Sequence, residues 1–302
     1  MIVNNSLLSP HFIMPKTWLF VPATRIDRIA KAFASGADAV IVDLEDTVAQ
    51  ADKAPARQAL QQYYRHYPYN HNHNHNHNHN HNHNAEYQPI WIRINQARSL
   101  DFAEDIKLCQ NLPNVAGILL AKAELAADIS DVHQRTHLPV IALIESAVGL
   151  YAMDSMAKAS GLLAFSYGFL DLCNDLRVQV GTKAADIIAN QIRYQLLVTS
   201  KVHQLSAPID TIYPDFNDTQ GLSCRAHLWS QMGMSGMLCI HPKQVATVQY
   251  ALQPTKAEIE FAIRVVEEYE RSGQAVFKID GNMVDAPVLQ RCFSLVGRVF
   301  NR

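Results

Sequence analysis

The chain has 302 residues, of which 48% are hydrophobic and 18% charged, as in an ordinary globular protein with room for one large domain or two smaller ones. Its formal net charge of -2 gives no electrostatic footprint for nucleic acid or an anionic membrane. No stretch approaches the roughly 20 apolar residues that cross a bilayer, and the first residues lack the features of a signal peptide, so we expect a cytoplasmic protein. Its five cysteines are scattered and show no CxxC or other metal-ligand spacing, so we expect them to be reduced thiols with a packing role.

Short apolar runs alternate with helical segments along residues 16–254. The first helical segment, RIDRIAKAFASG, places apolar side chains such as Ile29 and Phe33 on one face and ends at Gly36. Eight alternating units predict an α/β fold, a closed (β/α)₈ TIM barrel with a parallel sheet, and no GxGxxG motif follows the first strand to favour a dinucleotide fold. The eight strand-like runs are TWLFV (17–21), AVIVDLE (39–45), IWIRI (90–94), AGILLA (116–121), VIALIE (140–145), LLAFSYG (162–168), DTIYP (210–214) and GMLCI (236–240).

Three segments stand outside this alternation. Residues 1–15 form an N-terminal tail, and residues 255–302 form a C-terminal helical extension or lid, with helices expected at 257–271 and 288–300. The repeat NHNHNHNHNHNHNHN at 70–84 has nothing to bury, which predicts a disordered loop between a helix and a strand of the barrel. Its histidines should chelate zinc, nickel or copper in the test tube, and a metal-buffering role is one hypothesis, although a catalytic site needs ligands fixed by a scaffold.

Polar residues gather where the predicted strands end. In such barrels the C-terminal strand ends form one mouth that carries the chemistry. Two carboxylates on adjacent strands, without a thiol or an ordered histidine cluster, favour a hard cation, and Mg²⁺ fits best. Glu145, which closes the run VIALIE, is therefore expected to be a metal ligand. The residues of this mouth are Arg25, Asp43, Glu45, Asp46, Arg93, Asn95, Lys122, Glu145, Asp171, Asp215 and His241.

A family resemblance rests on motifs that run in order from about residue 16 to 300: WLFVPATR, GADAVIVDLEDTV, WIRIN, ALIESAVG, YGFLDLCNDL, IDTIYPDFNDTQGL, CIHPKQ and DGNMVDAP. Together they resemble the HpcH/HpaI aldolase and citrate lyase β-subunit superfamily, in its branch of citrate lyase β-like proteins and malyl-CoA or citramalyl-CoA lyases. The resemblance implies a magnesium ion on Glu145 and Asp171, with Arg93 on the substrate carboxylate or the enolate oxygen. It also implies that Asp285 reaches a neighbouring subunit's site, and hence a homotrimer or hexamer.

The activity implied is reversible Claisen-type carbon–carbon cleavage of a 3-hydroxyacyl-CoA thioester, such as malyl-CoA or citramalyl-CoA, to acetyl-CoA and a small 2-oxo acid. Arg93, Asp285 and Glu45 are the candidate catalytic residues, and a metal-bound water is the alternative to Asp285 for proton transfer. The candidate substrate-binding residues are Arg93, Glu145, Arg25 and Lys122. Two alternatives stay open, namely a citrate lyase β subunit that acts on a citryl acyl-carrier-protein thioester, and a non-catalytic acyl-thioester-binding protein.

The chain departs from the family pattern at positions that bear on CoA. VPATRI replaces a more glycine-rich turn, and DGNMVDAP lacks basic residues at Asn282 and Ala286, which indicates weaker nucleotide recognition or a different acyl carrier. Three polar residues also have structural interpretations: Asp46 as a helix cap, Asp175 as a solvated carboxylate, and His241 as a turn residue.

Overall fold

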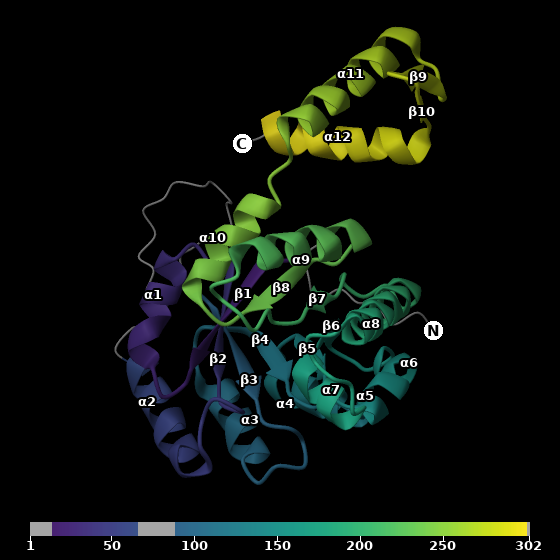
Figure 1. Cartoon of the computed structure of the whole chain (residues 1–302). Coiled ribbons are helices and arrows are strands. Elements are labelled where there is room, and N and C mark those ends of the chain that lie inside the picture. Colours follow the sequence, from purple (N-terminus) through teal and green to yellow (C-terminus); the bar gives the residue numbers. More distant parts are fainter. Residues whose placement is uncertain (1–13, 66–87, 301–302) are drawn as a thin grey trace. The chain divides into compact units, whose positions relative to one another are not determined.

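The computed structural model describes residues 14–65 and 88–300, so the His/Asn tract at 70–84 lies outside the described part. Eight parallel strands pair in chain order and close on themselves, with helices around them (Figure 1), which confirms the predicted (β/α)₈ barrel. The strands are β1 (Thr17–Pro22), β2 (Ala39–Asp43), β3 (Ile90–Ile94), β4 (Val115–Leu120), β5 (Val140–Ile144), β6 (Leu162–Tyr167), β7 (Ile209–Asp210) and β8 (Gly236–Cys239).

The helical segments of the barrel begin and end with ordinary capping chemistry. The hydroxyl of Thr182 accepts from a backbone nitrogen to start the longest of them, and Gly233, at φ 100°, ends another in the left-handed region that glycine tolerates. No helix of the described ranges is both long and apolar enough to cross a membrane. The segments are η1 (Ile26–Arg28), α1 (Ile29–Ala34), η2 (Gln50–Asp52), α2 (Lys53–Arg65), α3 (Phe102–Asn111), α4 (Ala126–Thr136), α5 (Ala147–Tyr151), α6 (Met153–Met156), α7 (Phe169–Asp175), α8 (Lys183–Val202), α9 (Thr219–Met232) and α10 (Pro242–Ala251).

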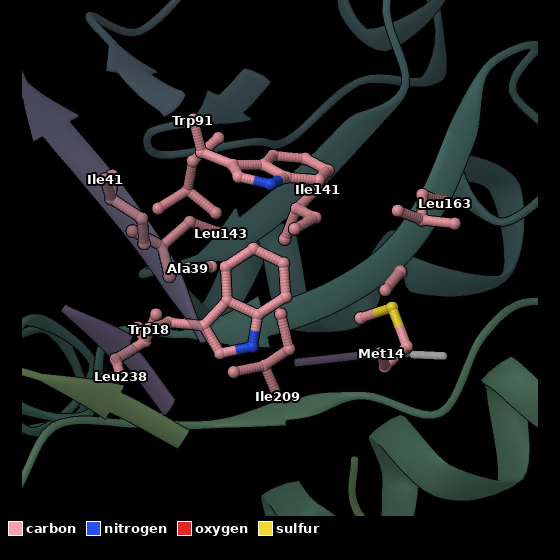
Figure 2. Packing of buried hydrophobic residues seen from close by; sticks show 12 residues of the cluster. Met14, Trp18, Ala39, Ile41, Trp91, Ile141, Leu143, Leu163, Ile209 and Leu238 are labelled. Atoms are coloured by element: carbon pink, nitrogen blue, oxygen red, sulfur yellow. The ribbon is translucent and has the colours of Figure 1, made fainter. Parts of the chain in front are cut away.

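The barrel interior is filled by a packed apolar cluster (Figure 2). Trp18 of β1 and Trp91 of β3 meet edge to face, with ring centroids 5.1 Å apart, and the indole nitrogen of Trp18 donates to the carbonyl of Pro15. Gly117 on β4 makes room for the second indole, because a Cβ there would lie 2.3 Å from the Trp91 ring. The barrel interior is therefore a packed core, and in such barrels the chemistry takes place at the C-terminal ends of the strands.

The seventh strand is shorter than the sequence predicts. Only Ile209 and Asp210 pair with β6 and β8, whereas the expected run extended to Pro214. The following backbone and side chains bond to other partners, since the Thr211 hydroxyl accepts from the start of α7 and the carbonyl of Tyr213 accepts from a side-chain amide of α10. The chain thus leaves the sheet early and forms the loop before α9.

Residues 252–302 form a second compact unit. It contains α11 (Lys256–Ser272), a hairpin of β9 (Phe277–Ile279) and β10 (Asn282–Val284), and α12 (Ala286–Phe300). A capping box between Thr255 and Glu258 starts α11, and Gly273 at φ 64° ends it. Its own core includes Val265, Phe277 and Leu289. The hairpin is an addition to the two helices that the sequence predicts.

Candidate active site

The loop after β2 is wrapped around a buried carboxylate. Asp43 has no exposed surface, and its Oδ1 accepts from the backbone nitrogen of Glu45 at 2.9 Å. Its Oδ2 accepts from the backbone nitrogen of Thr47 at 3.2 Å and from the hydroxyl of that threonine at 2.6 Å. These bonds fix the turn that presents Glu45 and Asp46 at the mouth.

Arg93, on β3, is clamped by the same carboxylate. Its Nε and Nη2 donate to the two oxygens of Asp43 at 2.6 and 2.7 Å, a bidentate pair, and its guanidinium lies 4.9 Å from the Phe20 ring centroid. Nη1 lies 3.2 Å from Glu45 Oε2 and 3.3 Å from Asp46 Oδ2. Burial opposes the charge on Arg93, but the hydrogen bonds and charge of Asp43 outweigh it and raise the pKa of the guanidinium. The same pair holds the pKa of Asp43 below its usual range against the effect of burial.

A buried lysine holds the backbone of the loop after β2. Lys53 Nζ donates to the carbonyls of Leu44 and Glu45 at 2.9 and 3.1 Å and to Asn95 Oδ1. The amide of Asn95 donates in turn to Asp105, at 2.7 Å. Asn95, which the sequence assigns to the mouth, therefore belongs to the scaffold under it.

Lys122 joins the loop after β4 to both sides of the mouth. Its Nζ donates to Glu45 Oε1 and lies 3.2 Å from Asp46 Oδ1, while its backbone nitrogen donates to Glu145 Oε2 at 2.8 Å. Burial lowers the pKa of Lys122, but its carboxylate partners outweigh that and raise it. Burial and the neighbouring Asp46 raise the pKa of Glu45. Burial also acts to raise the pKa of Asp46, but its contacts with Glu45, Arg93 and Lys122 outweigh that effect and lower the pKa.

Glu145 follows the last residue of β5 and is 5% exposed. Burial, opposed by the charge of Arg93, raises its pKa to about 8. Gly168, at the end of β6, leaves space for the carboxylate, because a Cβ there would lie 2.5 Å from Glu145 Oε1. The acid at the end of this buried strand therefore lies in a recess that the glycine leaves open.

Three carboxylates converge at this point. One oxygen each from Asp46, Glu145 and Asp171 lies within 4.8 Å of the other two. Asp171 is in the first turn of α7, and within the described ranges no hydrogen bond or ion pair engages its side chain. Mg²⁺ binds proteins through one or two carboxylates and keeps several waters, so open oxygens on Glu145 and Asp171 fit this ion. Asp46 contacts Arg93 and Lys122 rather than capping a helix.

Two further predicted site residues have local partners of their own. Arg25, after β1, forms an exposed bidentate pair with Asp27 at 2.9 and 2.8 Å. Asp285 belongs to the second unit, where its Oδ1 accepts from the backbone nitrogen of Val288 at 3.3 Å at the start of α12. Its predicted reach to a neighbouring subunit stays a prediction.

The remaining polar residues at the strand ends have local partners. Asp175 accepts from the first backbone nitrogen of α5 at 2.7 Å, so it is a structural hydrogen-bond acceptor, and Asp215 accepts from its own loop at 2.9 Å. The ring of His241 stacks on Phe216 at 4.6 Å, and its Nδ1 accepts from a backbone nitrogen two residues on. These contacts support the turn interpretation of His241.

Sequence reasoning missed two features of the site. It placed Asp43 at the mouth without a role, although this residue holds Arg93, and it gave no role to Gly168. The acidic cluster in DLED was the available signal for the first, and a glycine directly after a buried strand was the signal for the second.

Comparison with known proteins agrees with this geometry. The family model described as HpcH/HpaI aldolase/citrate lyase matches residues 16–242. A citrate lyase subunit beta-like protein of Mycobacterium tuberculosis is 31% identical over 284 residues, covering 93% of this chain and 94% of the relative. A (3S)-malyl-CoA thioesterase of Cereibacter sphaeroides is 30% identical over 273 residues, covering 88% of each.

A crystal structure of CitE from M. tuberculosis in complex with magnesium, acetoacetate and coenzyme A superposes with a TM-score of 0.79 at 30% identity, covering 94% of this chain and 98% of that one. The family model covers most of the chain, and the matched region holds every strand of the barrel and all three converging carboxylates. The chain belongs to the HpcH/HpaI aldolase/citrate lyase family.

Proposed function

We propose that the protein is a Mg²⁺-dependent carbon–carbon lyase that cleaves or forms a 3-hydroxyacyl-CoA thioester such as malyl-CoA or citramalyl-CoA. The observation that carries the proposal is the convergence of Asp46, Glu145 and Asp171 beside a buried, clamped arginine. A hard cation and a fixed guanidinium are the two groups that hold a 2-oxo acid and stabilise an enolate. The magnesium and coenzyme A of the CitE complex support the same assignment.

Glu145 and Asp171 would hold the metal. Glu145 comes from a rigid strand end and has Oε2 fixed by the backbone of Lys122 at 2.8 Å, so its free oxygen is preorganised. Asp171 is exposed and approaches from α7. Bound Mg²⁺ would supply Lewis-acid stabilisation to the carboxylate and carbonyl oxygens of the 2-oxo acid.

Arg93 would stabilise the thioester enolate oxygen. Asp43 engages Nε and Nη2, whereas Nη1 reaches Glu45 and Asp46 and is the nitrogen that would donate to a bound enolate. The clamp keeps the guanidinium charged and in one orientation before substrate binds, which is the preorganisation that makes an oxyanion donor effective. One such donor commonly contributes about 3 to 4 kcal/mol to the transition state.

Glu45 is the candidate base for the substrate hydroxyl in the cleavage direction. It is 7% exposed, and burial next to Asp46 raises its pKa, which makes it a better proton acceptor than a solvated glutamate. Lys122 and Arg93 fix both of its oxygens. Asp285 of a neighbouring subunit is the second candidate for proton transfer, and it requires a homotrimer or hexamer. Sedimentation that shows only a 34 kDa species at assay concentrations would exclude that second candidate.

A thioesterase activity is the second candidate function, because a relative at 30% identity bears that name. In that reaction the acyl–sulfur bond breaks and the carbon skeleton of malyl-CoA stays whole. A citryl thioester ranks below both, because its oxaloacetate product carries a further carboxylate that needs its own cation, and Arg25, the candidate substrate-binding residue after β1, is paired with Asp27.

The test is to incubate the purified protein with Mg²⁺ and, separately, malyl-CoA, citramalyl-CoA and citryl-CoA. Lyase action releases glyoxylate, pyruvate or oxaloacetate without free thiol, whereas thioesterase action releases free CoA thiol without an oxo acid. We expect oxo acid from the first two substrates, both accepted because one methyl group is worth only about 1 to 3 kcal/mol of discrimination. Oxaloacetate alone would reverse the ranking, and no product from any thioester would favour a binding protein.

A further inference from the structure

Lys122 has an unusual backbone conformation for its residue type. Its φ is 48°, in the left-handed region that few residues other than glycine adopt. In this conformation the residue makes two kinds of contact, a backbone N–H to Glu145 and an ammonium to Glu45 and Asp46. Backbone strain of this kind clusters at functional sites.

The ammonium and the guanidinium of Arg93 hold the third carboxylate of the cluster. Asp46 is one of the three converging acids, yet its Oδ1 faces Lys122 Nζ at 3.2 Å and its Oδ2 faces Arg93 Nη1 at 3.3 Å. Both oxygens of Asp46 are therefore engaged by cations. Within the described ranges, Glu145 Oε1 and the Asp171 carboxylate have no such partner.

We propose that Lys122 is a built-in cation that retains Asp46 and so limits the metal site to Glu145 and Asp171. This inference rests on the metal assignment of the proposed function. A third carboxylate on the ion would occupy a position needed by substrate oxygens and would reduce the positive charge available to them. Lys122 keeps coordination positions open and sets the affinity for the divalent ion.

Two physical effects predict the result of removing the ammonium. Its positive charge repels a divalent cation held by Glu145 and Asp171, and its loss frees Oδ1 of Asp46 to approach the ion, while Oδ2 still faces Arg93 Nη1. Both effects strengthen metal binding, in contrast to what loss of a substrate-binding lysine would do. The variant Lys122→Met keeps an unbranched side chain and places the same demand on φ, and Lys122→Arg is the matched variant that keeps the charge.

The experiment measures Mn²⁺ binding to the full chain by electron paramagnetic resonance, with Mg²⁺ as competitor. Binding that disappears in Glu145→Gln defines the barrel site and separates it from the histidine tract. We expect the dissociation constant at that site to fall about tenfold or more in Lys122→Met and to change less than about threefold in Lys122→Arg. Thermal unfolding and circular dichroism establish that each variant is folded.

A double-mutant cycle with Asp46→Asn isolates the retained carboxylate. Most of the tightening by Lys122→Met should be lost in the Asp46→Asn background. Unchanged or weaker Mn²⁺ binding in folded Lys122→Met, or equal tightening with and without Asp46, would overturn this inference alone. Absence of any Glu145-dependent Mn²⁺ binding in the wild-type protein would instead overturn the metal assignment, and this inference with it.

Discussion

The two sides of the barrel mouth differ in how their acids are paired. On the side of β2 to β4, Asp43, Glu45 and Asp46 contact Arg93 or Lys122 in a dense ionic network. On the side of β5 and β6, Glu145 accepts one backbone hydrogen bond, and no hydrogen bond or ion pair engages Asp171 among the described residues.

The contrast separates two tasks. Paired acids keep cations fixed and charged, which suits stabilisation of an anionic intermediate. Acids with open oxygens suit an ion that arrives from solution. Lys122 links the sides, because its ammonium belongs to the first and its backbone nitrogen to the second.

The largest effect is expected from removing the acids with open oxygens on the side of β5 and β6. Glu145→Gln and Asp171→Asn should each lower turnover by about a thousandfold or more, because the metal contributes several kcal/mol of charge stabilisation. Both replacements are nearly isosteric and should leave the fold intact. Steady-state assays with Mg²⁺ check this. Asp215→Asn is the matched control, since among the described residues this exposed acid bonds within its own loop, and it should stay near wild type. Full activity in either metal-site variant would refute the ligand assignment.

The next largest effect is expected from breaking an ion pair on the side of β2 to β4. Asp43→Asn should reduce kcat roughly tenfold to a hundredfold, because Arg93 loses the charge that orients it. It should also destabilise the fold by about 3 kcal/mol, since a buried guanidinium is left without a full partner. Asp101→Asn, at the 2.8 Å pair with Arg57, serves as control. Denaturant unfolding should show a stability loss there too, with kcat retained, and equal kcat loss in both would assign the effect to stability.

The same pair makes a pH prediction. Because the folded pKa of Asp43 lies below its usual value, its ion pair stabilises the fold above the unfolded pKa near 4 and that contribution is lost as pH falls through the folded value. Asp43→Asn should therefore flatten the acid side of the stability profile. Thermal unfolding between neutral and acid pH measures this, and an unchanged slope would show that other carboxylates dominate.

A smaller effect concerns the recess for Glu145. In Gly168→Ala the new Cβ would lie 2.5 Å from Glu145 Oε1, so the carboxylate must move and metal affinity should fall about tenfold. The residue has φ -95°, so alanine adds no backbone strain. Gly236→Ala creates a comparable clash, 2.3 Å from the Pro15 carbonyl, at the first residue of β8. This control variant should lower the stability of the fold without changing the dissociation constant for the metal. A loss of metal affinity in Gly236→Ala would refute the explanation that Gly168 acts through the recess for Glu145.

The sequence predicted the fold well for a physical reason. Strands covered on both faces appear as continuous apolar runs, and seven of the eight expected runs correspond to strands with ends shifted by two residues or fewer. The strand predicted at 210–214 was too long, because apolar and β-branched composition does not reveal where the neighbouring strands stop pairing. The ladder of β7 ends at Asp210, after which the Thr211 hydroxyl accepts from the backbone of α7 and the Tyr213 carbonyl accepts from the Gln244 side chain.

Positions at strand ends predicted several of the polar residues that meet at the mouth, but not how they pair. Arg93 and Asp43 are 50 residues apart in the chain, and Lys122 and Glu45 are 77 apart. Such pairings depend on side-chain directions in loops that periodicity does not encode. Asn95 illustrates the limit, because its place at the end of β3 suggested the mouth while its amide lies in the scaffold below.

The smallest expected effect tests whether the metal chemistry depends on the His/Asn tract at all. Deleting residues 70–84 removes seven imidazoles from between α2 and β3 and leaves Glu145 and Asp171 unchanged. Shortening a loop changes its closure entropy only slightly, so turnover with Mg²⁺ should stay within about twofold of wild type. Calorimetric titration with Zn²⁺ is the internal control, because high-capacity binding by imidazoles should disappear with the tract. If the deletion instead abolished turnover in a folded protein, the open carboxylates of β5 and β6 would be insufficient, and the tract would be part of the site.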